Sequence, residues 1–389
     1  MTVREPLRDS TILGYAKRKL DNTLDPKYNL PVDTEFNRAF SWFANKDVPS
    51  VLQPLLQQYV KWTQTFLVDP RDTIFISHII FSFAVVVPST FLLLYRFNWV
   101  HAILHTVMMV VTIPPFILML HCVSHKKTSK NGVADFLIHY ILCPFYGQTW
   151  STFYYHHVKH HHIEDNGPED LSSTIWYDRD NWMHFAIYYF RFYFLIGMEL
   201  PVYFYKKGKL NWGINVFVGE YLTIMFISSF FFVFDPRSVI FAWFVPLNFS
   251  RIGMMTGNWT QHAFLAQDDA TNDHKTALTV VESVYNATAF NDGYHTSHHL
   301  NSIRHWQDHP EHFFQNIEKY KSEKVVIFRD CDYWLIWCHL MVKDYKWLAN
   351  HYVDLTGKMT MDDKITFLRN RARRLTREEI AKCYPNYYS

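Results

Sequence analysis

Long apolar stretches alternate with polar segments along the chain. The apolar stretches 73–95 and 99–120 are separated by only three residues, and so are the stretches 212–234 and 238–257. Each stretch is close to the ~20 residues that a helix needs to cross a bilayer. Because the links are so short, each pair predicts an antiparallel hairpin. The pattern therefore predicts an all-α integral membrane protein with four transmembrane helices in two hairpins.

A fifth apolar stretch, 182–205, is long enough to span, but it contains charged residues and a proline. It ends in a basic segment that contains Lys206, Lys207 and Lys209. If this stretch spanned the bilayer, these lysines would lie on the far side, whereas basic residues are enriched on the cytosolic side of membrane proteins. We therefore expect the stretch to lie along the membrane interface. Both chain ends and the long polar segments then share the cytosolic face.

The remaining segments are less apolar. Residues 1–35 carry many charges and predict a loosely ordered tail, and residues 36–67 have the pattern of an amphipathic helix at the interface or against the cytosolic body. The short apolar stretch 134–150 predicts a re-entrant or interfacial helix. The expected organisation is a tail with an interfacial helix (1–70), a membrane domain (71–315) and the C-terminal part of a helical cytosolic cap (316–389).

Composition excludes several classes of protein. The net charge is only +2 and the basic residues are scattered, so nothing indicates a nucleic-acid partner. The five cysteines include no Cys-x-x-Cys pair, which argues against a disulfide framework or a thiolate zinc site. The first 31 residues lack the apolar region of a secretory signal, so we expect the first apolar stretch to direct insertion.

Histidines gather in three short boxes just beyond the apolar stretches. If the central box is helical, His157, His160 and His161 share one face and their rings can converge on an ion. Together with His262 at the end of the last span, the boxes supply nine candidate metal ligands: His121, His125, His157, His160, His161, His262, His295, His298 and His299. Nine imidazoles are too many for one ion and suit two ions with open positions. Spacing alone does not name the metal.

Two further histidines, His156 and His162, flank the central box and are predicted as second-shell partners of the ligands or as alternate ligands. A pair of ions at the lipid surface suits the activation of dioxygen, which can then remove hydrogen from an unactivated C–H bond. An apolar substrate would enter such a site from the bilayer.

Clustered histidines also occur in three unrelated kinds of sequence, and each fits these boxes less well. A solvated histidine tract would not repeat related spacings in three places. A metal transporter would place its ligands within the spans, whereas these boxes lie beyond them. A membrane zinc hydrolase would need a glutamate beside its histidines, as in His-Glu-x-x-His, and the sequence contains no such box.

The boxes His-x-x-x-His, His-x-x-His-His and His-x-x-His-His, interleaved with two hairpins, resemble the membrane fatty acid desaturase and hydroxylase superfamily over roughly residues 70–315. The resemblance implies a non-haem diiron centre with two iron ions, and oxidation of a lipid acyl or alkyl chain by dioxygen. Desaturation is the expected reaction, and hydroxylation of a lipid, alkane or terpenoid is the alternative. By similarity to acyl-CoA desaturases, Asn258 would hold one iron through a water.

The resemblance has two departures. The first box has one residue fewer between its histidines than in acyl-CoA desaturases, which leaves acyl-lipids, alkyl chains and terpenoids open as substrates. The chain has no His-Pro-Gly-Gly haem signature, so the resemblance implies a separate electron donor, cytochrome b5 or ferredoxin with its reductase. We expect a location in the endoplasmic reticulum membrane of a eukaryote or the inner membrane of a bacterium. The donor would meet cytosolic lysines: Lys126, Lys127, Lys130, Lys206, Lys207 and Lys209.

Overall fold

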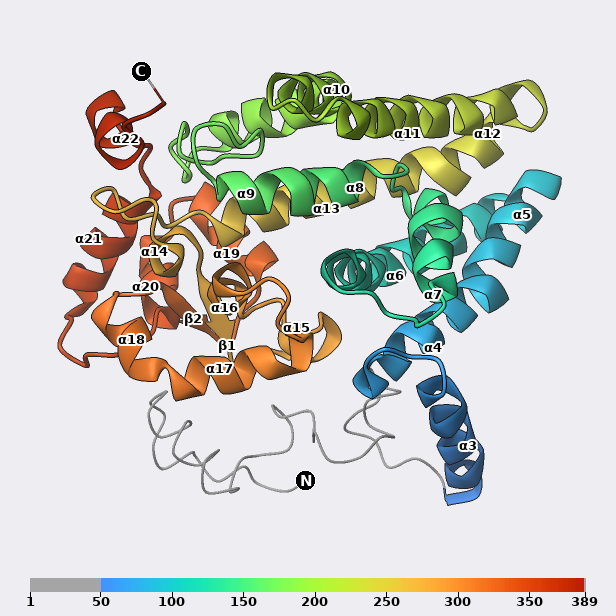
Figure 1. The fold of residues 1–389 in the computed structure, drawn as a ribbon, viewed down its shortest axis with the longest axis horizontal. Helices are drawn as coiled ribbons and strands as arrows, with labels where there is room; N and C mark the ends of the chain where they lie inside the picture. The colour runs from blue at the N-terminus through green and yellow to red at the C-terminus, as the bar shows by residue number, and fades with distance from the viewer. Residues whose placement is uncertain (1–49, 388–389) are drawn as a thin grey trace.

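The computed structural model describes residues 50–387, and this part of the chain is mostly helical (Figure 1). The predicted N-terminal tail lies outside the described residues. The first described α-helix, α3 (Gln53–Gln64), falls within the segment 36–67 that the sequence predicted as amphipathic. It exposes several large apolar side chains, among them Leu55 and Trp62. Such a surface fits a position at the membrane interface.

Five helices are long and apolar enough to cross a membrane. Four of them coincide with the predicted spans: Pro70–Tyr95, Trp99–His125, Leu210–Phe232 and Pro236–Gln261. The helices within them are α4 (Thr73–Phe81), α5 (Val87–Tyr95), α6 (Trp99–His125), α11 (Leu210–Ser229), α12 (Pro236–Val239) and α13 (Val245–Gln261). The fifth is α10 (Trp182–Lys206), which runs beside α11 in Figure 1. These helices indicate a membrane protein.

The turns that follow α5 and α11 lie together. The Arg237 guanidinium stacks over the Phe97 ring at 4.5 Å, and the Ser238 hydroxyl donates to the Leu93 carbonyl at 2.7 Å. At their other ends, α6 reaches His125 and α13 leads into His262. The two pairs of helices therefore have their turns at one end and their histidines at the other.

α10 qualifies as a fifth span by length and composition, yet both of its ends contact the histidine-bearing side. Before α10 begins, the Arg179 carbonyl accepts from the Trp259 indole at 3.0 Å, and Asp180 accepts from the Tyr345 hydroxyl at 2.9 Å. Directly after α10, the Lys207 ammonium lies 3.2 Å from the carboxylate of Glu164. The interfacial placement that we expected for this stretch stays a prediction, and these contacts favour it.

A buried ion pair joins the membrane helices. Glu220 of α11 pairs with Arg251 of α13, and both side chains are buried. Glu220 also accepts from the hydroxyl of Thr152 at 2.9 Å, and Arg251 donates to the Tyr193 carbonyl of α10 at 3.0 Å. Charges among apolar helices are costly unless they are paired and hydrogen-bonded. This network therefore fixes α10, α11 and α13 against the segment that begins the central histidine box.

Glycine permits the close packing at this junction. A Cβ atom on Gly219 would lie 2.1 Å from the carbonyl oxygen of Trp150. The segment before Trp150 comprises α7 (Val133–Phe136) and two irregular helical turns that continue to Tyr146. This helical segment is too short to cross a bilayer alone. α8 (Thr152–His156) then leads into the central box.

The cap follows α13 and is helical around a short sheet (Figure 1). β1 (Thr279–Val281) pairs in parallel with β2 (Ile327–Arg329), with Thr279 opposite Ile327. This pair corrects the expectation of an entirely helical cap. The cap helices are α14 (Asp273–Thr276), α15 (Val284–Thr288), α16 (His295–Leu300), α17 (His309–Gln315), α18 (Ile317–Ser322), α19 (Tyr333–Met341), α20 (Tyr345–His351), α21 (Met361–Ala372) and α22 (Arg377–Cys383).

Candidate metal centre

The central box is not a regular α-helix. α8 passes into a π-helical turn at His157–His161, followed by the short helix α9 (His162–Glu164). A π-helical turn brings residues i and i+5 together instead of i and i+4, and such turns are frequent at functional sites. His157 and His162 accordingly face each other, with their Nε2 atoms 3.1 Å apart. The turn therefore brings His162, rather than His160, beside His157.

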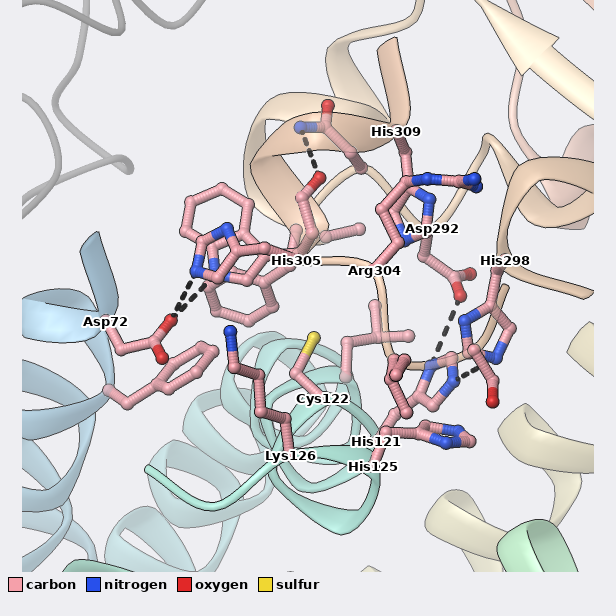
Figure 2. Close-up of a pocket in the computed structure, with 18 residues that line it drawn as sticks. Asp72, His121, Cys122, His125, Lys126, Asp292, His298, Arg304, His305 and His309 are labelled. Atoms are coloured by element: carbon pink, nitrogen blue, oxygen red, sulfur yellow. Dashed lines mark hydrogen bonds and ion pairs between the residues drawn. The ribbon is translucent and has the colours of Figure 1, made fainter. Parts of the chain in front are cut away.

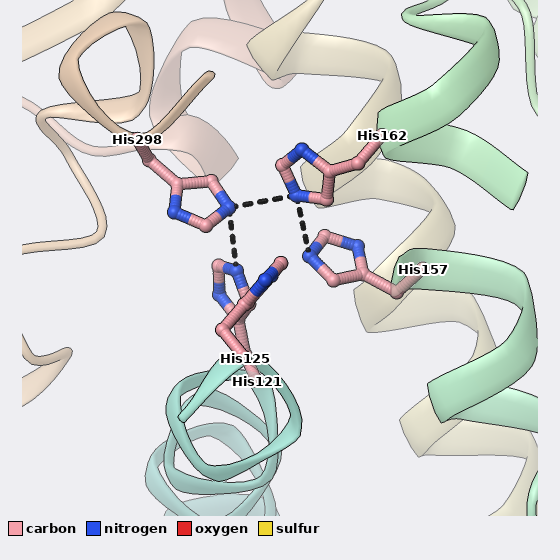
Figure 3. Close-up of side chains that lie close together, drawn as sticks. All are labelled: His121, His125, His157, His162 and His298. Carbon is pink, nitrogen blue, oxygen red and sulfur yellow. Dashed lines mark hydrogen bonds between the residues drawn. The ribbon is translucent and has the colours of Figure 1, made fainter. Parts of the chain in front are cut away.

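Five imidazoles converge between α6, the central box and α16 (Figure 3). The Nε2 atom of His298 lies 2.9 Å from that of His121 and 2.9 Å from that of His162. His157 joins the group through its contact with His162. The ring of His125 packs edge-on against that of His298, and its Nε2 atom is buried. We call this the five-histidine group: His121, His125, His157, His162 and His298.

A second group lies beside the first. His161, His262 and His299 bring a ligand atom each within 4.8 Å of one another. The Nε2 atom of His295 lies 3.1 Å from that of His299, and its ring centroid is 5.3 Å from that of His262. We call these residues the four-histidine group: His161, His262, His295 and His299. His161 lies in the central box, His262 directly follows α13, and His295 and His299 lie in α16.

The spacing within the groups fits metal ligands. Two imidazole nitrogens bound at right angles to one ion, each at about 2.1 Å as for zinc, lie about 3.0 Å apart. The Nε2 separations in the five-histidine group are 2.9 to 3.1 Å. A shared cation would satisfy all these lone pairs at once, which hydrogen bonds between neutral rings cannot do.

Three outer nitrogens of the four-histidine group are held by acceptors, whereas Nδ1 of His295 is buried without a hydrogen-bond partner among the described residues. Nδ1 of His161 lies 2.7 Å from Asp170, Nδ1 of His299 lies 2.8 Å from Asp165, and Nδ1 of His262 lies 2.8 Å from the Thr276 carbonyl. Because each Nδ1–H donates outward, each Nε2 keeps its lone pair toward the group. In the five-histidine group, Nδ1 of His121 lies 3.5 Å from Asp292.

Electrostatics keep most of these rings neutral. Burial, together with neighbouring imidazoles, holds the pKa of His157, His162 and His298 well below the ordinary value. Neutral imidazole is the form that binds a metal. His161 differs: burial lowers its pKa, but the charge and hydrogen bond of Asp170 outweigh this effect and raise it. That bond holds a proton on Nδ1 and leaves Nε2 for a ligand.

A cavity reaches the five-histidine group from the side of the cap (Figure 2). His121, His125 and His298 form part of its wall, and Figure 2 shows Lys126 and Arg304 beside them. Apolar side chains, including Phe75, Leu118 and Phe290, share the rest of the wall with polar ones such as Asp72 and His309. The cavity thus places a partly apolar space next to the candidate ligands.

Comparison with known proteins identifies the family. The model of the family described as fatty acid desaturase matches residues 97–328, more than half of the chain. This chain belongs to the fatty acid desaturase family. No curated protein matches it. The matched region of this desaturase-family protein contains all three histidine boxes and His262, but it begins after the first span.

Of the nine ligands predicted for this member of the desaturase family, the structure brings eight into the two groups. The ninth, His160, lies apart with His156 and Asp170, whereas His162, predicted only as a partner or alternate ligand, lies in the five-histidine group. Asn258 donates through its amide nitrogen to the Ser172 carbonyl at 3.0 Å and the Tyr188 hydroxyl at 2.7 Å. These contacts fix its orientation one turn before His262. The ligand roles themselves stay predictions.

The sequence interpretation missed the acidic partners of the histidines. Asp165 and Asp170 stand in the loop after the central box, which the sequence indicated only as a turn-rich acidic segment, and Asp292 stands three residues before the last box. Of the three, only Asp170 pairs with the box beside it in sequence, whereas Asp165 pairs with His299 and Asp292 with His121. Proximity to a box was therefore a signal for a carboxylate near the site, but not for the histidine that it contacts.

Proposed function

We propose that this member of the desaturase family oxidises an unactivated C–H bond in a lipid acyl or alkyl chain, with desaturation as the reaction. The supporting observation is the convergence of two groups of buried and partly buried imidazoles at the ends of apolar helices. Two iron ions suit these groups, because imidazole binds iron and the family assignment favours oxidative chemistry on lipids.

The proposed ligand set follows the two groups. One ion would be held by His121, His125, His157, His162 and His298, and the other by His161, His262, His295 and His299. His162 takes the place that the sequence interpretation gave to His160. Asn258 would complete the second site through a water, because its amide donors are occupied by Ser172 and Tyr188 and its carbonyl oxygen remains as an acceptor.

The overall desaturation is balanced as one substrate, one dioxygen, two electrons and two protons giving one alkene and two waters. When bound, the metal pair would supply the activation of dioxygen for hydrogen abstraction. The chain's own residues prepare the site for this chemistry: Asp165 and Asp170 orient their imidazoles, and burial of His161, His262 and His295 limits side reactions with water at the second site.

Hydroxylation of the same class of substrate is the alternative, since it begins with the same hydrogen abstraction. The short first box, His121-x-x-x-His125, leaves acyl-lipids, alkyl chains and terpenoids as possible substrates. The two reactions differ in the product: desaturation removes two hydrogen atoms, whereas hydroxylation adds one oxygen atom. Mass spectrometry of the reacted lipid therefore separates them.

The reaction needs an external electron donor, and we propose that an acidic protein such as cytochrome b5 or ferredoxin supplies the electrons. Six lysines on the proposed cytosolic face are exposed: Lys126, Lys127, Lys130, Lys206, Lys207 and Lys209. Lys207 is partly neutralised by Glu164 and Glu169, whereas the Lys127 ammonium contacts the carbonyl of Lys130. Opposite charge would steer the donor, and salt would screen the attraction over about 8 Å.

The test uses the full chain in lipid nanodiscs, with iron analysis followed by turnover with dioxygen and a reduced donor. We expect two iron ions per chain and an oxidised lipid product. His157→Ala and His262→Ala should each lower the iron content and abolish turnover, because each removes a central ligand of one group. His351→Ala is the matched control, since His351 lies in α20 outside both groups. Full activity in either ligand variant, or an iron-loaded protein without turnover, would contradict the proposal.

A further inference from the structure

A third set of metal-ligand atoms lies beside the four-histidine group. His156 at the end of α8, His160 in the π-helical turn and Asp170 in the following loop each offer one atom, and these atoms lie within 4.8 Å of one another. None of these residues belongs to the two groups described above. This third set comprises two imidazoles and a carboxylate.

The nitrogens of this set face one another without donors. Nε2 of His156 and Nδ1 of His160 are buried, and neither has a hydrogen-bond partner among the described residues. The other ring nitrogen of His160, Nε2, lies 3.2 Å from the Glu169 carbonyl and 3.3 Å from the Leu171 amide nitrogen. In the tautomer that donates from Nε2 to the Glu169 carbonyl, Nδ1 of His160 presents a lone pair. Buried lone pairs without partners are unfavourable, and a cation between them removes the penalty.

Asp170 supplies the negative charge. Its Oδ1 atom is held by the amide and hydroxyl of Ser172, both at 2.8 Å, and it lies 3.8 Å from Nδ1 of His160. That distance is too long for a hydrogen bond but suits two ligands of one ion, which lie at most about 4.2 Å apart for bonds of about 2.1 Å.

Aromatic rings close the site on the side of α10. The Phe192 ring stands edge-on to His156 at 4.9 Å, and the Tyr203 ring stands edge-on to His160 at 4.5 Å. Two neutral imidazoles and one carboxylate form a ligand set for a divalent first-row metal, and zinc commonly takes three such ligands with a fourth position for water.

We propose that His156, His160 and Asp170 bind a third metal ion, a zinc-like divalent cation, separate from the pair used for oxidation. The other oxygen of Asp170 accepts from Nδ1 of His161 at 2.7 Å, and this bond does not depend on the third ion. Its role is structural: it ties the central box to the loop 165–170. The proposal explains why the central box has more histidines than the other two.

Metal analysis of the full-length purified protein tests the site. Cells supplied with iron and zinc should yield protein with two iron ions and one zinc ion per chain. His156→Ala and His160→Ala should each remove the zinc and leave the iron content unchanged, whereas His351→Ala should change neither. X-ray absorption at the zinc edge of the unaltered protein should show two imidazole nitrogens and an oxygen ligand, a readout that does not depend on variants folding.

The outcomes separate this site from the proposed function. Unaltered protein with two iron ions and no zinc would overturn the third site and leave the oxidation proposal intact. Loss of iron in His156→Ala or His160→Ala would assign these residues to the iron pair and overturn the third site as well. Zinc that survives both substitutions, or that has only water-like oxygen ligands, would be adventitious and would also overturn it.

Discussion

At the scale of single residues, the contact of the outer imidazole nitrogen determines what the inner nitrogen can do. In the four-histidine group, Asp170, Asp165 and the Thr276 carbonyl each accept from an Nδ1 atom. This fixes the tautomer and the ring plane, so that the Nε2 lone pairs are arranged before an ion arrives. Such outer partners usually change metal affinity or activity by about 10- to 100-fold.

Replacing Asp165 tests this arrangement, because its carboxylate is the acceptor for His299. Asp165→Ala removes the acceptor, and we expect the iron affinity or the turnover to fall by about 10- to 100-fold. Asp165→Asn keeps an oxygen acceptor but loses the charge, so its effect should be smaller. Iron titration of the metal-free protein and lipid turnover measure the two effects. Asp362→Asn, at an exposed position in α21, is the control. Unchanged affinity in Asp165→Ala would rule out the orienting role.

At the scale of elements, the sequence predicted the helices whose apolar pattern is periodic, but not the elements that depend on contacts between distant segments. Apolar length predicted four of the five helices that are able to span a membrane, and spacing predicted that the histidine boxes converge. The π-helical turn at His157–His161 was not predictable, because its sequence fits an α-helix equally well and only packing selects the turn. The pairing of Thr279–Val281 with Ile327–Arg329 joins segments far apart in the chain, and three-residue strands leave no clear pattern.

The contact of α11 with the start of the central box gives a prediction at this scale. A methyl group on Gly219 would meet the Trp150 carbonyl, so Gly219→Ala should push the box segment away from α11 and cost about 1–3 kcal/mol. We expect a lower thermal unfolding temperature in detergent and a lower iron content. Gly253→Ala in α13 is the matched control, because no atom lies within 4 Å of its added methyl group. Equal stability of the two variants would mean that the packing at Gly219 is loose.

At the scale of the whole molecule, the arrangement of spans decides which face carries the chemistry. The turns after α5 and α11 meet at one end, and the histidines lie at the other. If α10 lies along the interface, both of its ends stay with the histidines, as the Lys207 contact with Glu164 favours. Four spans then put the boxes and the cap on the cytosolic face.

Labelling of Lys207→Cys tests this topology in sealed membrane vesicles, on a background in which the native cysteines are replaced by serine. We expect a membrane-impermeant thiol reagent to label position 207 from the cytosolic side. A cysteine in place of the exposed Arg237, in the first turn of α12, should label only from the opposite side. Labelling of position 207 only from the opposite side, with position 237 labelled from the cytosolic side, would show that α10 crosses the bilayer. Labelling of both positions from the same side would show that α11, which lies between them, does not cross.

Electron transfer gives a second prediction for the whole molecule. Lys127→Glu reverses an exposed charge in the polar segment after α6, and we expect slower reduction by an acidic donor protein at low salt. The difference from the unaltered protein should shrink as salt increases, and the iron content should not change. Stopped-flow reduction across a salt series measures this. Lys364→Glu, in α21 of the cap, is the control. A rate unaffected by Lys127→Glu would mean that the donor docks elsewhere and that the six cytosolic lysines contact anionic lipid headgroups instead.

The ion pair between Glu220 and Arg251 also bears on how the chain is made. Glu220 lies 31 residues before Arg251, so the acid emerges from the ribosome before its partner does. A single charge at the centre of a membrane helix costs about 2.5–3.5 kcal/mol on insertion scales. Insertion of both helices of the second hairpin together, rather than one helix at a time, therefore avoids the cost of an unpaired Glu220 in the lipid. A copy truncated between these helices would display a lone carboxylate to lipid, a feature by which cellular quality control can recognise unfinished chains.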